Sequence, residues 1–187
     1  KIRACEDGGN DHILVTLNQG NMHLSSIGWK TRDQALAGAR KATMTLHMKP
    51  SGGIHTGTVR HEFGHALGFL HEMGHHRWLD CAMAFNAPLY AKEQGHTFGA
   101  PPPDGIVTPA KALELTELAI TQQAMAYDPL KKYSDDFDPK SLMSYPVPKR
   151  YFDPARVPEG TDCRLNGASE TSKEDRKLFL DLYGRPA

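Results

Sequence analysis

The chain carries the run His61-Glu62-Phe63-Gly64-His65-Ala66-Leu67-Gly68-Phe69-Leu70-His71, in which three histidines recur. His61 and His65 are four residues apart, so on a helix they share one face and can each offer an imidazole nitrogen to one metal ion. His71 comes later, and a continuous helix would place it about 15 Å from His61 along the axis. The helix must therefore end between His65 and His71 if all three bind one ion.

Two further residues of the run suit such a site. Gly68 can end the helix, because glycine takes the left-handed conformation without steric cost. Glu62 can accept a proton from a zinc-bound water and pass it to a leaving amine. A helix with scattered histidines is the alternative, since 10 of the 187 residues are histidine. Chance would give five fixed residues at these spacings about once in ten thousand such chains. The run predicts one catalytic Zn²⁺ held by His61, His65 and His71, with Glu62 as general base.

The first part of the chain reads as sheet. Residues 12–17 are rich in β-branched residues and 42–48 alternate, so both predict strands. A turn is expected at 18–21, and the connector that follows it holds one short helix at 33–42. Thr56 or Thr58 can cap the histidine-bearing helix.

The second part reads as helix. One helix is expected from Pro109 to about Tyr127, and another from Ser172 to Tyr183, where Ser172 and Asp175 form a capping-box pattern. Strands come first and helices later, which favours an α+β fold over an alternating βαβ order.

Charge and hydropathy exclude several other classes. Lysine plus arginine and aspartate plus glutamate both number 22, so no basic excess indicates a nucleic-acid partner. No apolar run approaches the roughly 18 residues that span a bilayer. We expect one catalytic domain over residues 1–187, active as a monomer, with neither nucleic acid nor membrane as a partner.

The three cysteines are Cys5, Cys81 and Cys163. Their spacing is too wide for a zinc ribbon, so one disulfide and one leftover thiol are expected, with the pairing left open. An odd number of cysteines favours a secreted protein whose partner cysteine lies upstream.

A second motif, Ser141-Leu142-Met143-Ser144-Tyr145, follows downstream. The histidine run followed by this methionine resembles the metzincin zinc proteases. The resemblance implies that Met143 forms a tight turn beneath the metal without binding it. Tyr145 resembles the tyrosine that astacins and serralysins use as a displaceable zinc ligand and hydrogen-bond donor to the transition state. Glu72 matches the astacin acid that is tied to the mature N-terminus. Looser similarity elsewhere is to astacin-like secreted proteases of microbes, so we expect a secreted zinc endopeptidase.

The resemblance also implies an architecture. An upper subdomain of about 1–70 would hold a twisted sheet, with an edge strand over the cleft, and the active-site helix; a mainly helical or irregular lower subdomain would span about 71–187. Family members carry a helix and a strand before the point that matches Lys1, so these elements are expected to be missing or the chain to be a compact variant.

In this family an extended peptide or protein substrate lies antiparallel to the edge strand. The residues in the matching place are Ala42, Thr43, Met44, Thr45, Leu46, His47 and Met48. Pro146 and Val147 would lie near the pocket for the side chain after the scissile bond. Lys149 and Arg150 either favour an acidic residue there or are solvated surface charge.

Two other functions fit the same residues: a catalytically silent zincin-fold binding module, and a zinc hydrolase of a non-peptide substrate. Intact Glu62 and Tyr145 speak against the first. An open edge strand favours peptides, whereas a closed, deep pocket favours a small molecule. The segment 87–129 is longer than the usual link between the third ligand and the methionine turn, and the sequence assigns it no role.

Overall fold

The computed structural model describes residues 13, 15–18, 23–25, 27, 43–49, 52–96, 107–121 and 137–184. The chain divides into two compact units, Lys1–Leu70 and His71–Ala187. The strands of the described sheet lie in the first unit, and most helices lie in the second. The prediction of an α+β protein is therefore confirmed. No helix of the described residues is both long and apolar enough to cross a membrane.

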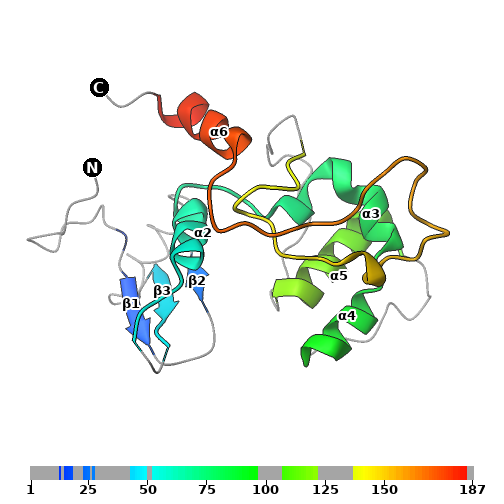
Figure 1. The fold of residues 1–187 in the computed structure, drawn as a ribbon, viewed down its shortest axis with the longest axis horizontal. Coiled ribbons are helices and arrows are strands. Elements are labelled where there is room, and N and C mark those ends of the chain that lie inside the picture. Colours follow the sequence, from blue (N-terminus) through cyan, green and yellow to red (C-terminus); the bar gives the residue numbers. More distant parts are fainter. Residues whose placement is uncertain are drawn as a thin grey trace, which may run out of the picture. The chain divides into compact units, whose positions relative to one another are not determined.

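The first unit contains a three-stranded sheet (Figure 1). Its strands are β1 (Val15–Asn18), β2 (Leu24–Ser25) and β3 (Met44–His47), in the order β1-β3-β2. β3 runs parallel to β1 and antiparallel to β2. Met44 and Leu46 alternate along β3 and are buried, as expected when one face of a strand packs inward.

Two expectations about this unit are wrong in detail. Leu24–Ser25 was expected in a connector but forms β2, and Asn18 was expected in a turn but pairs with His47. Both segments are short and become strands because β3 offers bonding partners on each side, which the local sequence does not reveal. The short helix expected at 33–42 lies outside the described residues.

Helix α2 (Thr56–Ala66) follows the sheet and packs against β2 and β3. The turn before it places Gly52 and Gly53 at φ values of 79° and 84°. His55 is the N-cap, without a side-chain capping bond. The expectation that Thr56 or Thr58 caps the helix is therefore wrong, because Thr56 is already the first helical residue and Thr58 lies two residues further along the helix.

The second unit is mainly helical. Its elements are η1 (Glu72–Gly74), η2 (His76–Trp78), α3 (Leu79–Ala84), α4 (Ala87–Gln94), α5 (Pro109–Thr121), η3 (Lys149–Tyr151) and α6 (Lys173–Tyr183). Helices α3 and α4 both pack on α5 around a core that includes Trp78, Leu113 and Tyr151.

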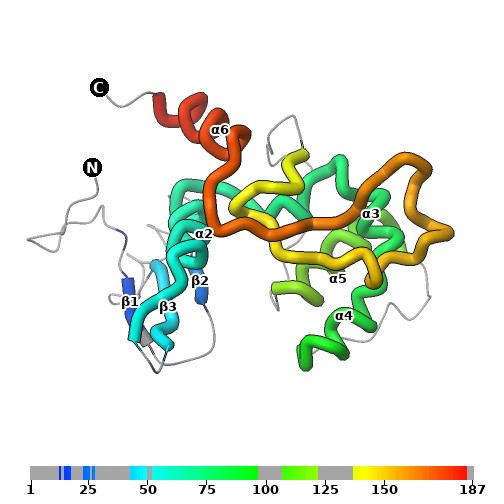
Figure 2. The backbone as a smooth tube through the Cα atoms, in the orientation of Figure 1, coloured from blue at the N-terminus to red at the C-terminus, as the bar shows by residue number. Residues whose placement is uncertain are grey.

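The segment after residue 137 doubles back on itself beside these helices (Figure 2). Val147 and Leu165 form an antiparallel bridge, with Val147 N donating to Leu165 O at 2.8 Å. Cys81 of α3 forms a disulfide with Cys163, so the expected single disulfide is present and its pairing is resolved. Cys5 lies outside the described residues. The bridge therefore joins the two arms of the doubled segment, and the disulfide fixes that segment to α3.

Both predicted late helices are present. α5 begins at Pro109, and Thr108 Oγ1 accepts a hydrogen bond from Lys111 N at 3.2 Å. Its expected end near Tyr127 falls outside the described residues. In α6 both bonds of the capping box between Ser172 and Asp175 are present, and Gly184 ends the helix.

Candidate metal centre

The histidines of the opening motif cluster in space. One nitrogen from each of His61, His65 and His71 lies within 4.8 Å of the others. His65 and His71 are buried, and His61 is half-buried. Among the described residues this is the group of histidine, cysteine and acidic side chains that can hold a metal ion.

The end of α2 explains how His71 comes to lie beside His61 and His65. Leu67 is the C-cap, and Gly68 follows it at φ 94°. Gly68 N donates to His65 O at 2.8 Å and Phe69 N donates to Gly64 O at 3.0 Å. This pair of bonds is a Schellman motif, which ends the helix and satisfies its last carbonyls. The helix therefore ends in the interval that the histidine spacing requires.

The same turn orients His65. Its Nδ1 lies 2.9 Å from the carbonyl oxygen of Phe69. In a neutral imidazole that donates from Nδ1, the lone pair is on Nε2. Such a bond fixes the tautomer of a metal-binding histidine and leaves Nε2 directed at the ion.

His71 has a different partner. Its Nδ1 lies 3.1 Å from Oε2 of Glu117, and both side chains are buried. Glu117 lies on α5, 46 residues further along the chain. Glu117 was not predictable as a site residue, because no local pattern links a glutamate in one helix to a histidine in an earlier turn.

These features fit a zinc ion. Three imidazoles form a donor set known from catalytic zinc sites, where a fourth position stays open for water or substrate. His65 and His71 both have an acceptor at Nδ1, as metal-binding histidines almost always do. His61 meets His65 edge to face, with ring centroids 4.8 Å apart.

Glu62 is placed on α2 beside these ligands. It is 4% exposed. It follows His61 directly and precedes His65 by three residues, and residues three apart are neighbours on a helix surface. A carboxylate buried beside metal-binding histidines is suited to act as a general acid or base at the metal site.

The predicted methionine turn is built from residues of the second unit. Ser144 N donates to Ser141 O at 3.1 Å, and Glu72 N donates to Met143 O at 3.1 Å. Met143 is 2% exposed. The turn is thereby bonded to the residue that directly follows His71.

Tyr145 lies beside the third histidine. Its ring is half-buried and meets the ring of His71 at an angle of 80°, with centroids 5.2 Å apart. The chain thus brings together His71 and the tyrosine that the family resemblance assigns to catalysis.

Glu72 is a buried acid with a perturbed pKa. Burial raises the pKa of its carboxyl to about 7, although the hydrogen bond from Asp138 N to Oε1 acts in the opposite direction. The negative charges of Asp138 and Asp175 raise the pKa further. The expected tether to the N-terminus involves residues outside the described part and stays a prediction.

The assignment of 42–48 as the edge strand is wrong. β3 has β1 on one side and β2 on the other, so its backbone is already paired within the sheet. Met44 and Leu46 are buried, while Thr43, Thr45, His47 and Met48 are half-buried. Ala42 lies outside the described residues. The alternating pattern identified a strand correctly but cannot show how many neighbours that strand has.

Pro146 and Val147 were both expected near the pocket for the side chain after the scissile bond, but they differ in exposure. Pro146 is exposed. Val147 is 0% exposed, belongs to the hydrophobic core and pairs with Leu165. The side chain of Val147 therefore faces the core, and its expected place near the substrate pocket stays a prediction.

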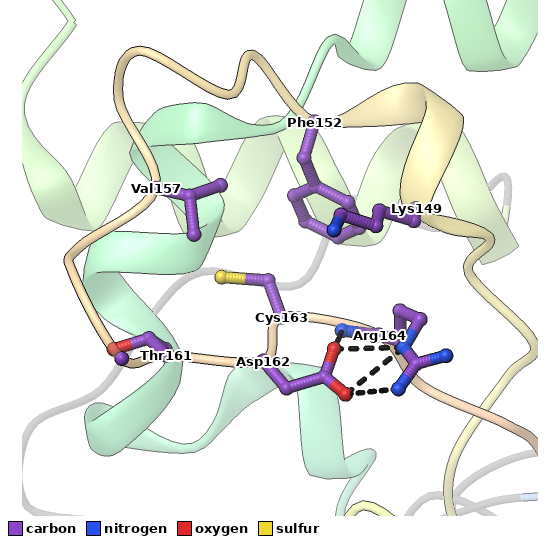
Figure 3. A pocket seen from close by; sticks show the side chains of 8 residues that line it. Lys149, Phe152, Val157, Thr161, Asp162, Cys163 and Arg164 are labelled. Carbon is purple, nitrogen blue, oxygen red and sulfur yellow. Dashed lines mark hydrogen bonds and ion pairs between the residues drawn. The ribbon is translucent and has the colours of Figure 1, made fainter.

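A surface cavity of about 350 Å³ lies near η3, and its lining includes Lys149, Asp162 and Arg164 (Figure 3). Arg164 Nε donates to Asp162 Oδ1 at 2.8 Å, and hydrogen bonds from the side chain and the backbone of Arg164 lower the pKa of Asp162 to about 2. Arg150, the second basic residue of the pair expected near the substrate pocket, donates a hydrogen bond to Tyr151 Oη at 2.6 Å.

The described fold and the histidine cluster define a mixed α+β protein with a candidate metal centre. No family model and no curated protein matches the chain. Among solved structures, the fold is similar to that of myroilysin, with a TM-score of 0.58 and 22% identity over 97% of this chain and 77% of that chain. A second myroilysin structure aligns with a TM-score of 0.48 and 23% identity, over 96% of this chain and 68% of the other.

Proposed function

We propose that the chain is a zinc-dependent endopeptidase of the metzincin type, in the astacin-like group that carries a tyrosine after the methionine turn. The observation that carries the proposal is the cluster of His61, His65 and His71. Two of its members have the acceptors at Nδ1 that metal-binding histidines use. The likeness in fold to myroilysin agrees with this proposal.

Each side chain then has a defined task. Zinc bound by three imidazoles supplies a Lewis acid that lowers the pKa of water to about 7. Glu62 accepts the proton of the attacking water and delivers it to the leaving amine. Tyr145, beside His71, donates a hydrogen bond to the oxygen on which negative charge develops.

The substrate is proposed to be a protein or an extended peptide. Among the described strands, β2 is the antiparallel strand at the edge of the sheet, and it packs against α2. An extended peptide can add to such an edge through main-chain hydrogen bonds, which bind without much sequence preference. We further propose that the protein acts as a secreted monomer, and the disulfide between Cys81 and Cys163 is compatible with secretion.

The test combines zinc stoichiometry with cleavage of casein and a quenched internal peptide, each with and without a chelator. Glu62→Gln is expected to keep zinc and to lose turnover by about 10²-fold or more. His65→Ala is expected to lose the metal itself. Zinc-loaded wild-type protein that cleaves neither substrate would contradict the protease proposal and favour a binding module. Cleavage of a small non-peptide ester alone would favour a different zinc hydrolase.

A further inference from the structure

Helix α5 presents one charged residue on its buried face. The other buried residues of this helix are Ala112, Leu113, Thr116, Ala119 and Ile120. Glu117 lies among them and is 5% exposed. An acidic side chain is almost never fully buried without a partner, because removing a charge from water is costly. An apolar residue would fill this place in the core at a lower cost.

The partner of this carboxylate explains why a glutamate is present. Oε2 of Glu117 lies 3.1 Å from Nδ1 of His71, and the side chains are 6% and 3% exposed. α5 packs directly on η1, the short helix that begins one residue after His71. The position of Glu117 is thus set by packing between two elements of the same compact unit.

The candidate ligands differ in the groups that hold them. The acceptor for His65 is a backbone carbonyl, that of Phe69, which belongs to the turn ending α2. The acceptor for His71 is a carboxylate, and hydrogen bonds to ionised groups are roughly twice as strong as those between neutral groups. Carboxylate, histidine and zinc in series form a recurrent arrangement in metal sites.

We propose that Glu117 is a positioning residue of the metal centre: its carboxylate accepts a hydrogen bond from Nδ1 of His71, fixes the ring with Nε2 toward the ion and strengthens zinc binding. The inference rests on the metal site of the proposed function, but not on the substrate or on peptide cleavage. It also gives a role to part of the long segment 87–129, since α5 supplies this side chain.

The test measures zinc affinity by competition with a chromogenic chelator at one fixed pH. Glu117→Ala is expected to weaken zinc binding by about 10- to 100-fold, the usual cost of losing such an outer partner. Glu117→Gln keeps an oxygen acceptor of the same reach without the charge, so a smaller loss is expected. Glu114→Gln is the matched control, because Glu114 lies on the same helix, is paired with Lys111 and is partly exposed. It is expected to bind zinc as the wild type does.

Two further measurements separate positioning from stability. The Co²⁺-substituted wild type and Glu117→Gln are expected to differ in their visible absorption bands, which report ligand geometry. Urea unfolding of the zinc-free proteins shows whether each variant retains the fold. If Glu117→Ala does not fold, Glu117→Gln replaces it in the zinc-affinity measurement.

Zinc affinity equal to that of the wild type in every Glu117 variant that folds, the alanine variant included, would overturn the inference, even if wild-type peptidase activity is present. Wild-type protein that binds zinc but cleaves nothing would refute the proposed function, while a loss of affinity in the Glu117 variants would still support the inference. Wild-type protein that binds no zinc would overturn both.

Discussion

Asp175, in the first turn of α6, accepts a hydrogen bond from the hydroxyl of Ser141 at 2.8 Å. Its second oxygen accepts bonds from Leu142 N and from Ser172 N, at 2.8 and 2.9 Å. The residue that completes the capping box of α6 therefore also holds the methionine turn. Helix capping and the support of Met143 depend on one carboxylate.

Asp175→Ala is expected to be more destabilising than the loss of a helix cap. Capping residues contribute about 1 kcal/mol, and buried donors left without a partner at Ser141 and Leu142 add about 1–3 kcal/mol each. Ser172→Ala is the matched control, because it removes only the capping hydroxyl. Urea unfolding of the zinc-free proteins measures the loss of unfolding free energy in each variant. Equal losses in Asp175→Ala and Ser172→Ala would show that Asp175 acts as a cap alone.

Gly167 lies directly against Pro146, the residue after Tyr145. Its φ is 65°, and a Cβ at this position would lie 3.0 Å from Pro146 Cδ and 3.2 Å from Pro146 N. Gly167→Ala is expected to cost about 1 kcal/mol for the left-handed backbone, and 1–3 kcal/mol more for the close contact. Gly160→Ala separates the two effects, since Gly160 has a φ of 75° and open space around it. Equal free energies of unfolding for the two variants would exclude a packing role for Gly167.

Glu72 predicts a pH dependence of stability in the zinc-free protein. Its pKa is about 7 in the folded chain and 4.5 for the ordinary side chain, with burial as the main cause. Between these values the folded state binds more protons than the unfolded state, so this group lowers stability as the pH rises from about 4.5 to 7, and has no further effect above 7. Glu72→Gln removes the titration but retains an oxygen that can accept from Asp138 N.

The measurement is urea unfolding of wild type and Glu72→Gln at pH 5 and pH 8, with chelator present. From pH 5 to pH 8 the free energy of unfolding of the wild type is expected to fall by on the order of 1–3 kcal/mol relative to that of the variant. A difference that is the same at both pH values would contradict a raised pKa for Glu72.

The parts of the site that follow from local geometry were predictable from the sequence. The spacing of His61, His65 and His71 requires a helix that stops, and Gly68 marks where it stops. Glu117 and Asp175 were not identified as site residues because they reach their partners over 46 and 34 residues of chain. Helical periodicity shows that such residues lie on a helix but not what that helix packs against.

Strand order was not predictable for a related reason. Alternation along 42–48 indicated a strand, and Met44 and Leu46 do face inward. The same alternation is compatible with a central strand or an edge strand, because it reports burial of the two faces and not pairing of the two sides. Pairing of β3 with both β1 and β2 comes from residues more than eighteen positions earlier. It leaves β1 and β2 at the two edges of the described sheet.

Tyr145→Phe tests the catalytic tyrosine without disturbing its packing. Phenylalanine keeps the ring that meets His71 edge to face, so the fold and the bound zinc are expected to be retained. The loss of the hydroxyl removes a hydrogen-bond donor to the developing oxyanion, and the removal of one such donor costs about 10²-fold or more in kcat. Because this bond strengthens only in the transition state, KM is expected to change little. Zinc stoichiometry and steady-state cleavage of a quenched peptide check both parts. Unchanged kcat with zinc retained would leave Tyr145 a purely structural neighbour of His71, whereas loss of zinc would mean that the hydroxyl supports the metal site itself.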